Sequence, residues 1–398
     1  MASNQSVVIV GAKRTPIGSF QGQFNDSSAI DLGAAAIAGA LAHAGIDAAD
    51  ASDVIMGCVL PAGLGQAPAR QAALQAGVPA SVGCLTVNKV CGSGMKAVML
   101  GHDAIRAGSS DIVIAGGMES MSNAPYLLQK ARGGLRMGHG EVIDHMFWDG
   151  LQNPYDTQMM GVFGEMCAEK YGFSRTDQDA FAYASVERAQ RAVHEGQFVD
   201  EIVPVTVTTR KGQHVYKEDE EPHRCNLGKI PTLKPAFKKD GTVTAANASK
   251  ISDGAAATVL MTAAEAERRG LQPLARIVAH ATFAQAPEWF TTAPSTAVKQ
   301  VVEKAGWTMD QVDLFEINEA FASVTMAAMK DNDLDHAKVN VNGGACALGH
   351  PLGASGARLL VTLIHALRRR GLRRGVASLC LGGGEAVAIA IEVQAIEV

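Results

Sequence analysis

The stretch that decides the fold is CGSGMKAVMLGHDAIRAGSSDIVIAGGMES, residues 91–120. A glycine-rich opening leads into a helix-like apolar repeat, which is followed by an apolar strand and a glycine turn. The same order recurs over residues 349–393, GHPLGASGARLLVTLIHALRRRGLRRGVASLCLGGGEAVAIAIEV. Such an internal repeat predicts two similar halves built from the same elements, related by a pseudo-twofold axis.

A second repeated pair lies upstream of the first. Residues 29–59 and 294–320 each read as a helix, a short acidic connection and an apolar strand. Alternating strands and helices predict an α/β fold with mostly parallel sheets, covered by helices on both faces. The chain has 398 residues, of which 47% are hydrophobic and 42 are glycine, the composition of an α/β enzyme with a large core.

The segment between the repeats differs from both. Residues 119–241 are richer in charge and methionine, and their first part lacks a sustained period. Long irregular segments in compact proteins are usually lids or interfaces, so we expect an insertion that folds over the sheet. The predicted division is an N-terminal half (1–118 and 242–270), an inserted loop domain (119–241) and a C-terminal half (271–398).

Composition and charge argue against several classes of function. The net charge of -5 disfavours a nucleic-acid partner, and the basic cluster RRRGLRR, residues 368–374, suits the C terminus of a helix. Seven cysteines without a CxxC pair favour a reducing compartment over a disulfide framework or a zinc ribbon. We also see no membrane-length apolar run, no secretion signal and, in the C-terminal QAIEV, no peroxisomal signal, and therefore expect a cytoplasmic protein.

Cys91 is the first candidate for chemistry. It stands at the start of an expected helix and is followed by Gly92, Ser93 and Gly94. The unpaired N–H groups of a helix N terminus favour a thiolate, so we expect a lowered pKa, and the small neighbours suggest an exposed sulfur. Cys91 is therefore a candidate nucleophile.

Three further candidates for chemistry lie in a glycine-rich turn or at the end of a strand. His350 occupies the second half's version of the junction that holds Cys91, so the pseudo-twofold brings together a cysteine and a histidine, a recurrent way to activate a thiol. Cys380 ends an apolar strand before three glycines, where backbone N–H groups can approach a ligand. Asn318 ends another strand, and its amide suits either an oxyanion hole or a helix cap.

We expect two exposed thiols and one histidine, and their spacing in the sequence is not that of a metal-binding motif. Such a set predicts acyl chemistry through a thioester, with a separate proton-transfer step. A cysteine protease needs no second cysteine. Cys58 and Cys84 lie in ordinary apolar settings, and we expect both to serve packing.

Taken together, these motifs resemble the thiolase family along essentially the whole chain. The segments in the family's order are VCGSGMKAV, GGMESMSNAPY, GTVTAANASKISDGAA, NEAFA, GGACALGHPLGASGAR and CLGGGEAVA. The likeness is greatest to the biosynthetic acetyl-CoA acetyltransferases of that family. It implies a duplicated five-layered αβαβα fold with an inserted loop domain for CoA binding and oligomer contacts, and a homotetramer built as a dimer of dimers.

The resemblance also implies a role for each candidate. Cys91 matches the cysteine that is acetylated by the first acetyl-CoA, and His350 the base that activates it. Cys380 matches the acid/base that takes a proton from the methyl group of the second acetyl-CoA. Asn318 matches the residue that holds a water beside the thioester carbonyl, and the N–H groups of Cys91 and Gly382 match the hole for the oxygen of the acyl-enzyme.

For substrate binding, the resemblance implies three groups of residues. Ser249 matches a contact to the pantetheine arm, and Phe237 lies beside that arm. Met160 and Phe321 match the lining of the acyl pocket, where bulky side chains favour acetyl and acetoacetyl groups. Arg224 with Lys229 suits the nucleotide end of CoA, although a solvated basic loop explains both equally well.

The expected reaction is the condensation of two acetyl-CoA to acetoacetyl-CoA and CoA, together with the reverse thiolysis, without a resident cofactor or metal. The alternative within the family is a degradative 3-ketoacyl-CoA thiolase of broad chain length. A ketoacyl synthase would carry a second histidine where Cys380 stands, and a silent carrier or scaffold protein would not need to keep all four catalytic residues. The chain departs from many members at Met159, which replaces a histidine, and also at Cys346 and Ala386.

Overall fold

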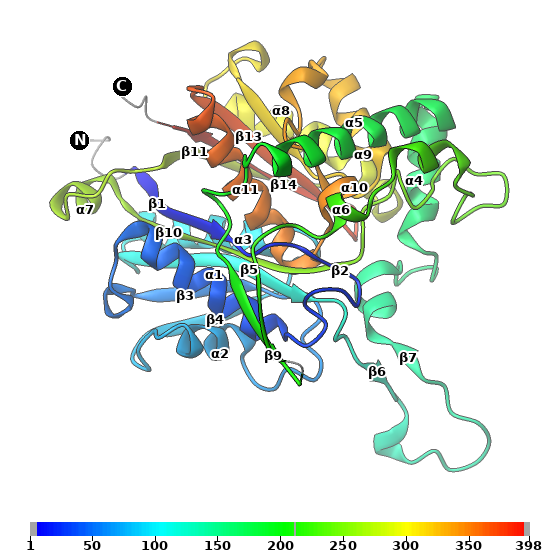
Figure 1. Cartoon of the computed structure of the whole chain (residues 1–398), viewed down its shortest axis with the longest axis horizontal. Coiled ribbons are helices and arrows are strands. Elements are labelled where there is room, and N and C mark those ends of the chain that lie inside the picture. The colour runs from blue at the N-terminus through cyan, green and yellow to red at the C-terminus, as the bar shows by residue number, and fades with distance from the viewer. Residues whose placement is uncertain (1–5, 211, 394–398) are drawn as a thin grey trace.

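A computed structural model describes residues 6–210 and 212–393 of the chain. Residues 1–5, the start of the segment in which we see no secretion signal, lie outside the described residues. The C-terminal QAIEV also lies outside them. One large mixed sheet runs through the molecule in the order β12-β13-β14-β11-β1-β10-β5-β3-β4, and β2 pairs with β10 beside this path (Figure 1). Its strands are β1 (Val7–Arg14), β2 (Gly18–Ser19), β3 (Asp53–Gly57), β4 (Gly83–Val87), β5 (Ile112–Ser120), β10 (Ser252–Thr262), β11 (Ala275–Ala284), β12 (Leu314–Ile317), β13 (Arg374–Leu381) and β14 (Glu385–Glu392).

The strand order confirms the duplication. The order β1-β10-β5-β3 of the N-terminal half matches the order β11-β14-β13-β12 of the C-terminal half. The two halves of the sheet join at a short antiparallel contact, in which Val8 pairs with Arg276 and Ile9 with Ala275.

The expectation of mostly parallel sheets is wrong. Within the described chain, β3 is parallel to β4 and β5, and β12 is parallel to β13, whereas the other pairings of the large sheet are antiparallel. The cause lies in the last strand of each half. Strand β14 follows β13 through the turn of residues 382–384, and so short a connection joins antiparallel strands. Strand β10 returns antiparallel to β5 after the insertion.

Helices and sheets form five layers. On the outside of the N-terminal half lie α1 (Ala29–Ala44) and α2 (Pro68–Gln75), which contact β1, β10, β3 and β4. In the centre, α3 (Ser93–Ala107) and α11 (Leu352–Arg369) pack against each other and against strands of both halves. On the outside of the C-terminal half, α8 (Ala293–Lys304) covers β11, β13 and β14, and α9 (Ala322–Asp331) packs on α8. The largest core lies around the central helix pair.

Local sequence signals explain where these helices begin and end. Ser28 and Asp31 form a capping box at the start of α1, and Gly45 ends that helix with a φ of 65°. Helix α11 is buried from Leu352 to Leu367, as its apolar sequence predicts for a central helix. The basic cluster follows it as expected, with Arg369 paired to Asp200 at 2.7 Å.

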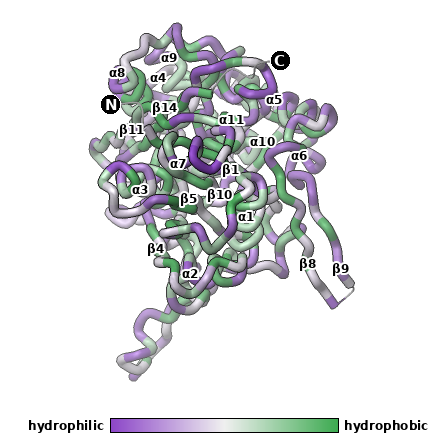
Figure 2. Tube along the Cα trace, turned by 90° about the vertical axis from the view of Figure 1, so that its left-hand side faces the viewer, coloured by the Kyte–Doolittle hydropathy of each residue, from purple (hydrophilic) through white to green (hydrophobic). Residues whose placement is uncertain are grey.

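The inserted segment supplies a further set of elements. These are β6 (Tyr126–Leu127), β7 (Ile143–Asp144), a π-helical turn (Met146–Leu151), α4 (Met160–Tyr171), α5 (Arg175–His194), β8 (Val205–Thr209), β9 (Gly212–Tyr216) and α6 (Glu221–Arg224). The β8–β9 hairpin stands off from the body of the molecule (Figure 2). Helices α4 and α5 reach across to the C-terminal half, where they contact α9 and α10 (Ala345–Leu348). The remaining short helix, α7 (Ala263–Arg268), follows β10, and no helix among the described residues is long and apolar enough to cross a membrane.

Candidate active site

The two junctions that carry Cys91 and His350 meet at the central helix pair. Cys91 directly precedes Gly92, the N-cap of α3, and His350 directly precedes Pro351, the N-cap of α11. A Cβ atom at Gly94 would lie 2.8 Å from the carbonyl oxygen of Gly353, so only glycine lets the two helix starts approach this closely. The glycines after Cys91 therefore serve helix packing rather than exposure of the sulfur.

The environment of Cys91 differs from the sequence expectation. The residue is half-buried, and burial raises the pKa of its thiol to about 12. The backbone N–H groups of Gly382 and of Cys91 itself point to the sulfur and oppose this rise, but burial prevails. The predicted lowered pKa and exposed thiol are thus wrong, and the resting sulfur carries its proton at neutral pH.

A strained turn presents Cys91, and the sequence analysis did not identify it. Val90, a β-branched residue, has a φ of 46°, in the left-handed region that such residues avoid. The side chain of Asn88 accepts a hydrogen bond from the Val90 N–H at 2.9 Å, and Ser93 Oγ donates to the Val90 carbonyl at 2.6 Å. An ion pair between Lys89 and Glu385 ties this turn to the start of β14 in the other half.

His350 is buried and held in one orientation. Burial lowers the pKa of its imidazole to about 3, so the ring is neutral at pH 7. Its Nδ1 lies 2.5 Å from Ser355 Oγ, which itself donates to the carbonyl of Pro351 at 2.8 Å. Because the single hydroxyl proton goes to that carbonyl, Oγ accepts from Nδ1–H, which leaves the lone pair of the ring on Nε2 of His350.

Asn318 lies beside His350, as the sequence analysis expected for the assembled site. Its Nδ2 is 3.4 Å from Nε2 and 3.5 Å from Nδ1 of the imidazole. Its Oδ1 is buried and has no hydrogen-bond partner among the described residues. A buried amide oxygen of this kind is costly unless a ligand or a water donates to it.

Cys380 lies one residue before the end of β13, opposite Ala386 of β14, and is buried, not exposed as predicted. It belongs to an apolar cluster with Phe163, Phe290 and Phe321, which explains the burial. Burial raises the pKa of its thiol well above the usual value, and the charge of a Cys91 thiolate raises it further. The two sulfurs are therefore close enough to influence each other's ionisation.

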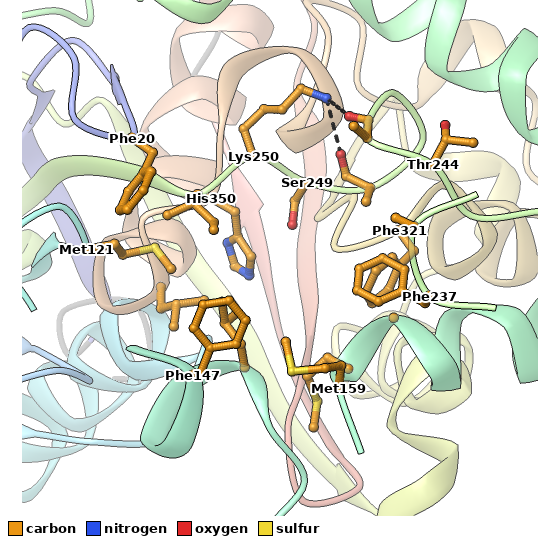
Figure 3. A pocket seen from close by; sticks show the side chains of 18 of the residues that line it. Phe20, Met121, Phe147, Met159, Phe237, Thr244, Ser249, Lys250, Phe321 and His350 are labelled. Carbon is orange, nitrogen blue, oxygen red and sulfur yellow. Dashed lines mark hydrogen bonds between the residues drawn. The ribbon is translucent and has the colours of Figure 1, made fainter. Parts of the chain in front are cut away.

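A cavity of about 400 Å³ opens in front of His350 (Figure 3). Four of the predicted substrate-binding residues line it, namely Met160, Phe237, Ser249 and Phe321. The rings of Phe237 and Phe321 meet edge to face at 6.2 Å on one side of the cavity, and Phe20, Met121 and Phe147 lie on the other side of His350. Met159, the replacement for the usual histidine, also lines the cavity.

Arg224 and Lys229 lie outside the residues that line this cavity. Both are exposed, and Arg224 Nη1 pairs with Glu220 Oε1 at 3.3 Å. Glu221, at the start of the same short helix α6, does line the cavity, so Arg224 stands near its rim. A role for either residue at the nucleotide end of CoA stays a prediction.

Glu119 is a second residue that the sequence analysis did not single out. It is fully buried near the end of β5, where its Oε2 accepts hydrogen bonds from the N–H groups of Val59 at 3.0 Å and Gly353 at 2.8 Å. Its Oε1 accepts from the N–H of Leu60 at 3.1 Å. The available signal was the sequence GGMES, which places a carboxylate at the end of an otherwise apolar strand. Burial raises the pKa of Glu119 to about 7.

Comparison with known proteins agrees with this geometry. The family model described as the thiolase N-terminal domain matches residues 7–264, and that of the thiolase C-terminal domain matches residues 271–393. The chain is 50% identical to an acetyl-CoA acetyltransferase of Pseudomonas aeruginosa, over 97% of this chain and 99% of that protein. A Rhizobium meliloti protein of the same name is also 50% identical, over 98% of this chain and 99% of its own length. The crystal structure of the Bacillus anthracis acetyl-CoA acetyltransferase superposes with a TM-score of 0.96 at 42% identity, covering 99% of this chain and all of that one.

Proposed function

The chain belongs to the thiolase family, and from this premise we propose that it condenses two molecules of acetyl-CoA to acetoacetyl-CoA and CoA, and catalyses the reverse thiolysis. The protein is an acyltransferase of the acetyl-CoA C-acetyltransferase type. The observation that supports the chemistry most is the close approach of the two helix starts that Cys91 and His350 precede, where a Cβ atom at Gly94 would lie 2.8 Å from the carbonyl oxygen of Gly353. The degradative, broad-chain alternative is not favoured by the relatives.

In the first half-reaction, Nε2 of His350 removes the proton of Cys91 while the sulfur attacks the carbonyl carbon of acetyl-CoA. The N–H groups of Gly382 and Cys91, which point to the sulfur, are placed for the oxyanion of the tetrahedral intermediate. The departing CoA sulfur takes a proton from Cys380 and leaves as CoA. The result is acetyl-Cys91, an imidazolium at His350 and a thiolate at Cys380.

In the second half-reaction, the Cys380 thiolate removes a methyl proton from the next acetyl-CoA. Acetyl-Cys91 carries no charge, so it does not oppose the Cys380 thiolate, whereas a Cys91 thiolate would raise the pKa of Cys380. The enolate oxygen is stabilised by the His350 imidazolium and by a water held at Asn318 Oδ1. The enolate carbon attacks acetyl-Cys91, and the released Cys91 sulfur recovers its proton from His350.

The experiment that tests this assignment is a brief incubation with acetyl-CoA, followed by mass analysis of the peptides. We expect the acetyl group on Cys91, and we expect His350→Ala to slow the labelling sharply. An acetyl group on Cys380 would reverse the roles of the two thiols, and labelling of neither would refute a covalent mechanism.

The preference for short acyl groups is supported by the cavity lining, since Met160 and Phe321 reduce the space beside His350. Each methylene that an apolar pocket accepts or refuses is worth about 1 to 3 kcal/mol, so selectivity should be graded. We expect kcat/KM for thiolysis to fall from acetoacetyl-CoA to 3-ketohexanoyl-CoA and again to 3-ketooctanoyl-CoA. A value that rises or stays level would favour the broad-chain alternative.

We further propose a homotetramer and a cytoplasmic location, with CoA thioesters as the only small molecules that the reaction requires. The arm of residues 126–144 projects from the body (Figures 1 and 2) and exposes Tyr126, Val142 and Met137, whose side chain is 98% exposed. Apolar groups on a projecting arm suit contacts between subunits. The seven cysteines are all free, which suits a reducing compartment.

A further inference from the structure

Two histidines and an aspartate converge away from the active site, where α3 of the N-terminal half meets β11 of the C-terminal half. His102 and Asp103 follow each other on α3, and His280 lies on β11. Oδ1 of Asp103 lies 3.0 Å from Nδ1 of His102 and 2.9 Å from Nε2 of His280. One ligand atom from each of the three residues lies within 4.8 Å of the other two. The proposed acyl transfer uses none of these residues.

This geometry is close to that of a metal site with three protein ligands. Two ligands bound to a tetrahedral zinc ion are about 3.3 Å apart, so the three atoms need to move little to surround an ion. The two rings lie edge to face with centroids 5.0 Å apart, and their side chains are mostly buried, whereas Asp103 is 51% exposed. An ion can therefore enter from solvent on the side of the carboxylate and keep a water as its fourth ligand.

The residue types of the cluster also suit a cation. Two imidazoles and a carboxylate are ligands that suit zinc and the neighbouring transition metals.

Three cationic side chains surround the cluster, and they limit its affinity unequally. Arg276 contacts Oε2 of Glu392 at 2.5 Å, a carboxylate that it shares with Arg373 and Arg374, and Lys304 donates to the backbone carbonyl of His280 at 3.3 Å. Arg106 follows His102 by about one helical turn on α3 and lines the same surface pocket as His102 and Asp103. Arg106 is therefore the group that most opposes a bound cation.

We propose that His102, Asp103 and His280 form a binding site for a divalent transition-metal ion, which clamps α3 to β11 and so joins the two halves of the molecule. Cys91 precedes Gly92, the N-cap of α3, but the cluster lies about three turns further along this helix, roughly 16 Å from Cys91 at 1.5 Å per residue. The bound ion consequently stabilises the fold without taking part in acyl transfer.

The test uses the full chain, freed of metal by a chelator and then titrated with Zn²⁺ by calorimetry, with Co²⁺ as a spectroscopic substitute. We expect one ion per chain, at least tenfold weaker binding in His280→Gln and in Asp103→Asn, and unchanged binding in the control His214→Gln, which alters an exposed histidine on β9. Arg106→Gln should bind several-fold more tightly, because it removes the opposing charge. At a hundredfold excess over the dissociation constant, Zn²⁺ should raise the melting temperature by about 2 to 4 °C.

The active-site thiols are the competing ligands, and two measurements separate them from the cluster. At the proposed site the Co²⁺ spectrum lacks the intense near-ultraviolet bands of thiolate ligation, and one equivalent of Zn²⁺ leaves turnover of acetyl-CoA unchanged. Thiolate bands, loss of turnover at one equivalent, unaltered affinity in both His280→Gln and Asp103→Asn, or no binding at all would each overturn the proposal.

Discussion

Strands β5 and β13 occupy matching places in the two halves, and near its end each of them carries a side chain that serves the helix of the other half. From β5, Glu119 accepts the N–H of Gly353 in the first turn of α11, the helix that His350 precedes. From β13, Cys380 lies close enough to Cys91, before α3, for the charges of the two sulfurs to interact. Each half thus extends one side chain toward the helix of the other half, Glu119 to bind backbone N–H groups and Cys380 to bring a second thiol near Cys91.

The two helix starts also differ in the surroundings of the residue that precedes them. Cys91 is half-buried, on a turn whose Val90 has a φ of 46°. His350 is buried, and a serine fixes its tautomer. Duplication supplied two equivalent junctions, and each could then acquire a different function, the nucleophile in one and the base in the other.

The largest expected effect comes from replacing Cys380, the reactive residue of the two. Cys380→Ala should still accept an acetyl group on Cys91, although more slowly, because the attack uses His350 while the departing CoA sulfur loses its proton donor. It should lose exchange of the methyl protons of acetyl-CoA with deuterated water by about 10²- to 10⁴-fold, the usual contribution of a general base. Exchange at the normal rate would show that Cys380 is not the base.

Replacing Glu119, whose role is structural, should instead lower the stability of the fold. Glu119→Gln places an amide N–H₂ where the carboxylate accepts several backbone N–H groups, so at least one buried donor loses its partner. We expect a loss of about 1 to 3 kcal/mol in the free energy of unfolding, measured by denaturant titration. Acetylation of Cys91 should slow by about tenfold, as the start of α11 shifts.

Glu195→Gln is the matched control for that variant, because Glu195 is exposed and follows α5 at a distance from the site. It should leave both the unfolding free energy and the acetylation rate unchanged. Equal behaviour of the two variants would mean that the contact between Glu119 and Gly353 does not hold the base in place.

The sequence predicted the duplication, the central helices and the meeting of the junctions that carry Cys91 and His350, because these depend on local pattern and on the order of repeats. The places of Asn318 and Cys380 beside them followed only from the resemblance to the thiolase family. The sequence did not predict the direction of β10 and β14, since strand direction depends on how a chain returns after a turn or an insertion. It also gave the wrong ionisation for Cys91. A helix start favours a thiolate locally, whereas the burial that prevails here comes from segments distant in the sequence.

The roles of Glu119 and Ser355 could not be predicted from the sequence, and the reason is the same. Glu119 accepts hydrogen bonds from the backbone N–H groups of residues 59, 60 and 353, and no local sequence pattern predicts partners so distant in the chain. Ser355 lies five residues after His350, but the bent start of α11 at Pro351 decides whether its hydroxyl reaches the ring. Both roles depend on the folded geometry.

A smaller effect is expected from Ser355→Ala, which removes the acceptor for Nδ1–H of His350. The ring can then adopt either tautomer, and Nε2 carries the lone pair for only part of the time. We expect acetylation of Cys91 to slow by about tenfold with little change in KM for acetyl-CoA, because the serine does not line the cavity. A rise in KM at constant kcat would indicate a role in binding instead.

The smallest expected effect is the response of the unaltered protein to pH, and it tests the idea that the two junctions meet as a neutral pair. His350 acts as a base when it is neutral, which holds above its pKa of about 3, and Cys91 starts as a thiol, which holds below its pKa of about 12. Between these values the reactive pair is fully populated, so the rate of acetylation, measured by rapid quench at saturating acetyl-CoA, should change less than about twofold from pH 6 to pH 8. A preformed thiolate–imidazolium pair would behave differently, because its loss on acidification produces a sigmoidal fall. A midpoint between pH 6 and pH 7.5 would therefore mean that the helix start, rather than burial, governs the ionisation of Cys91.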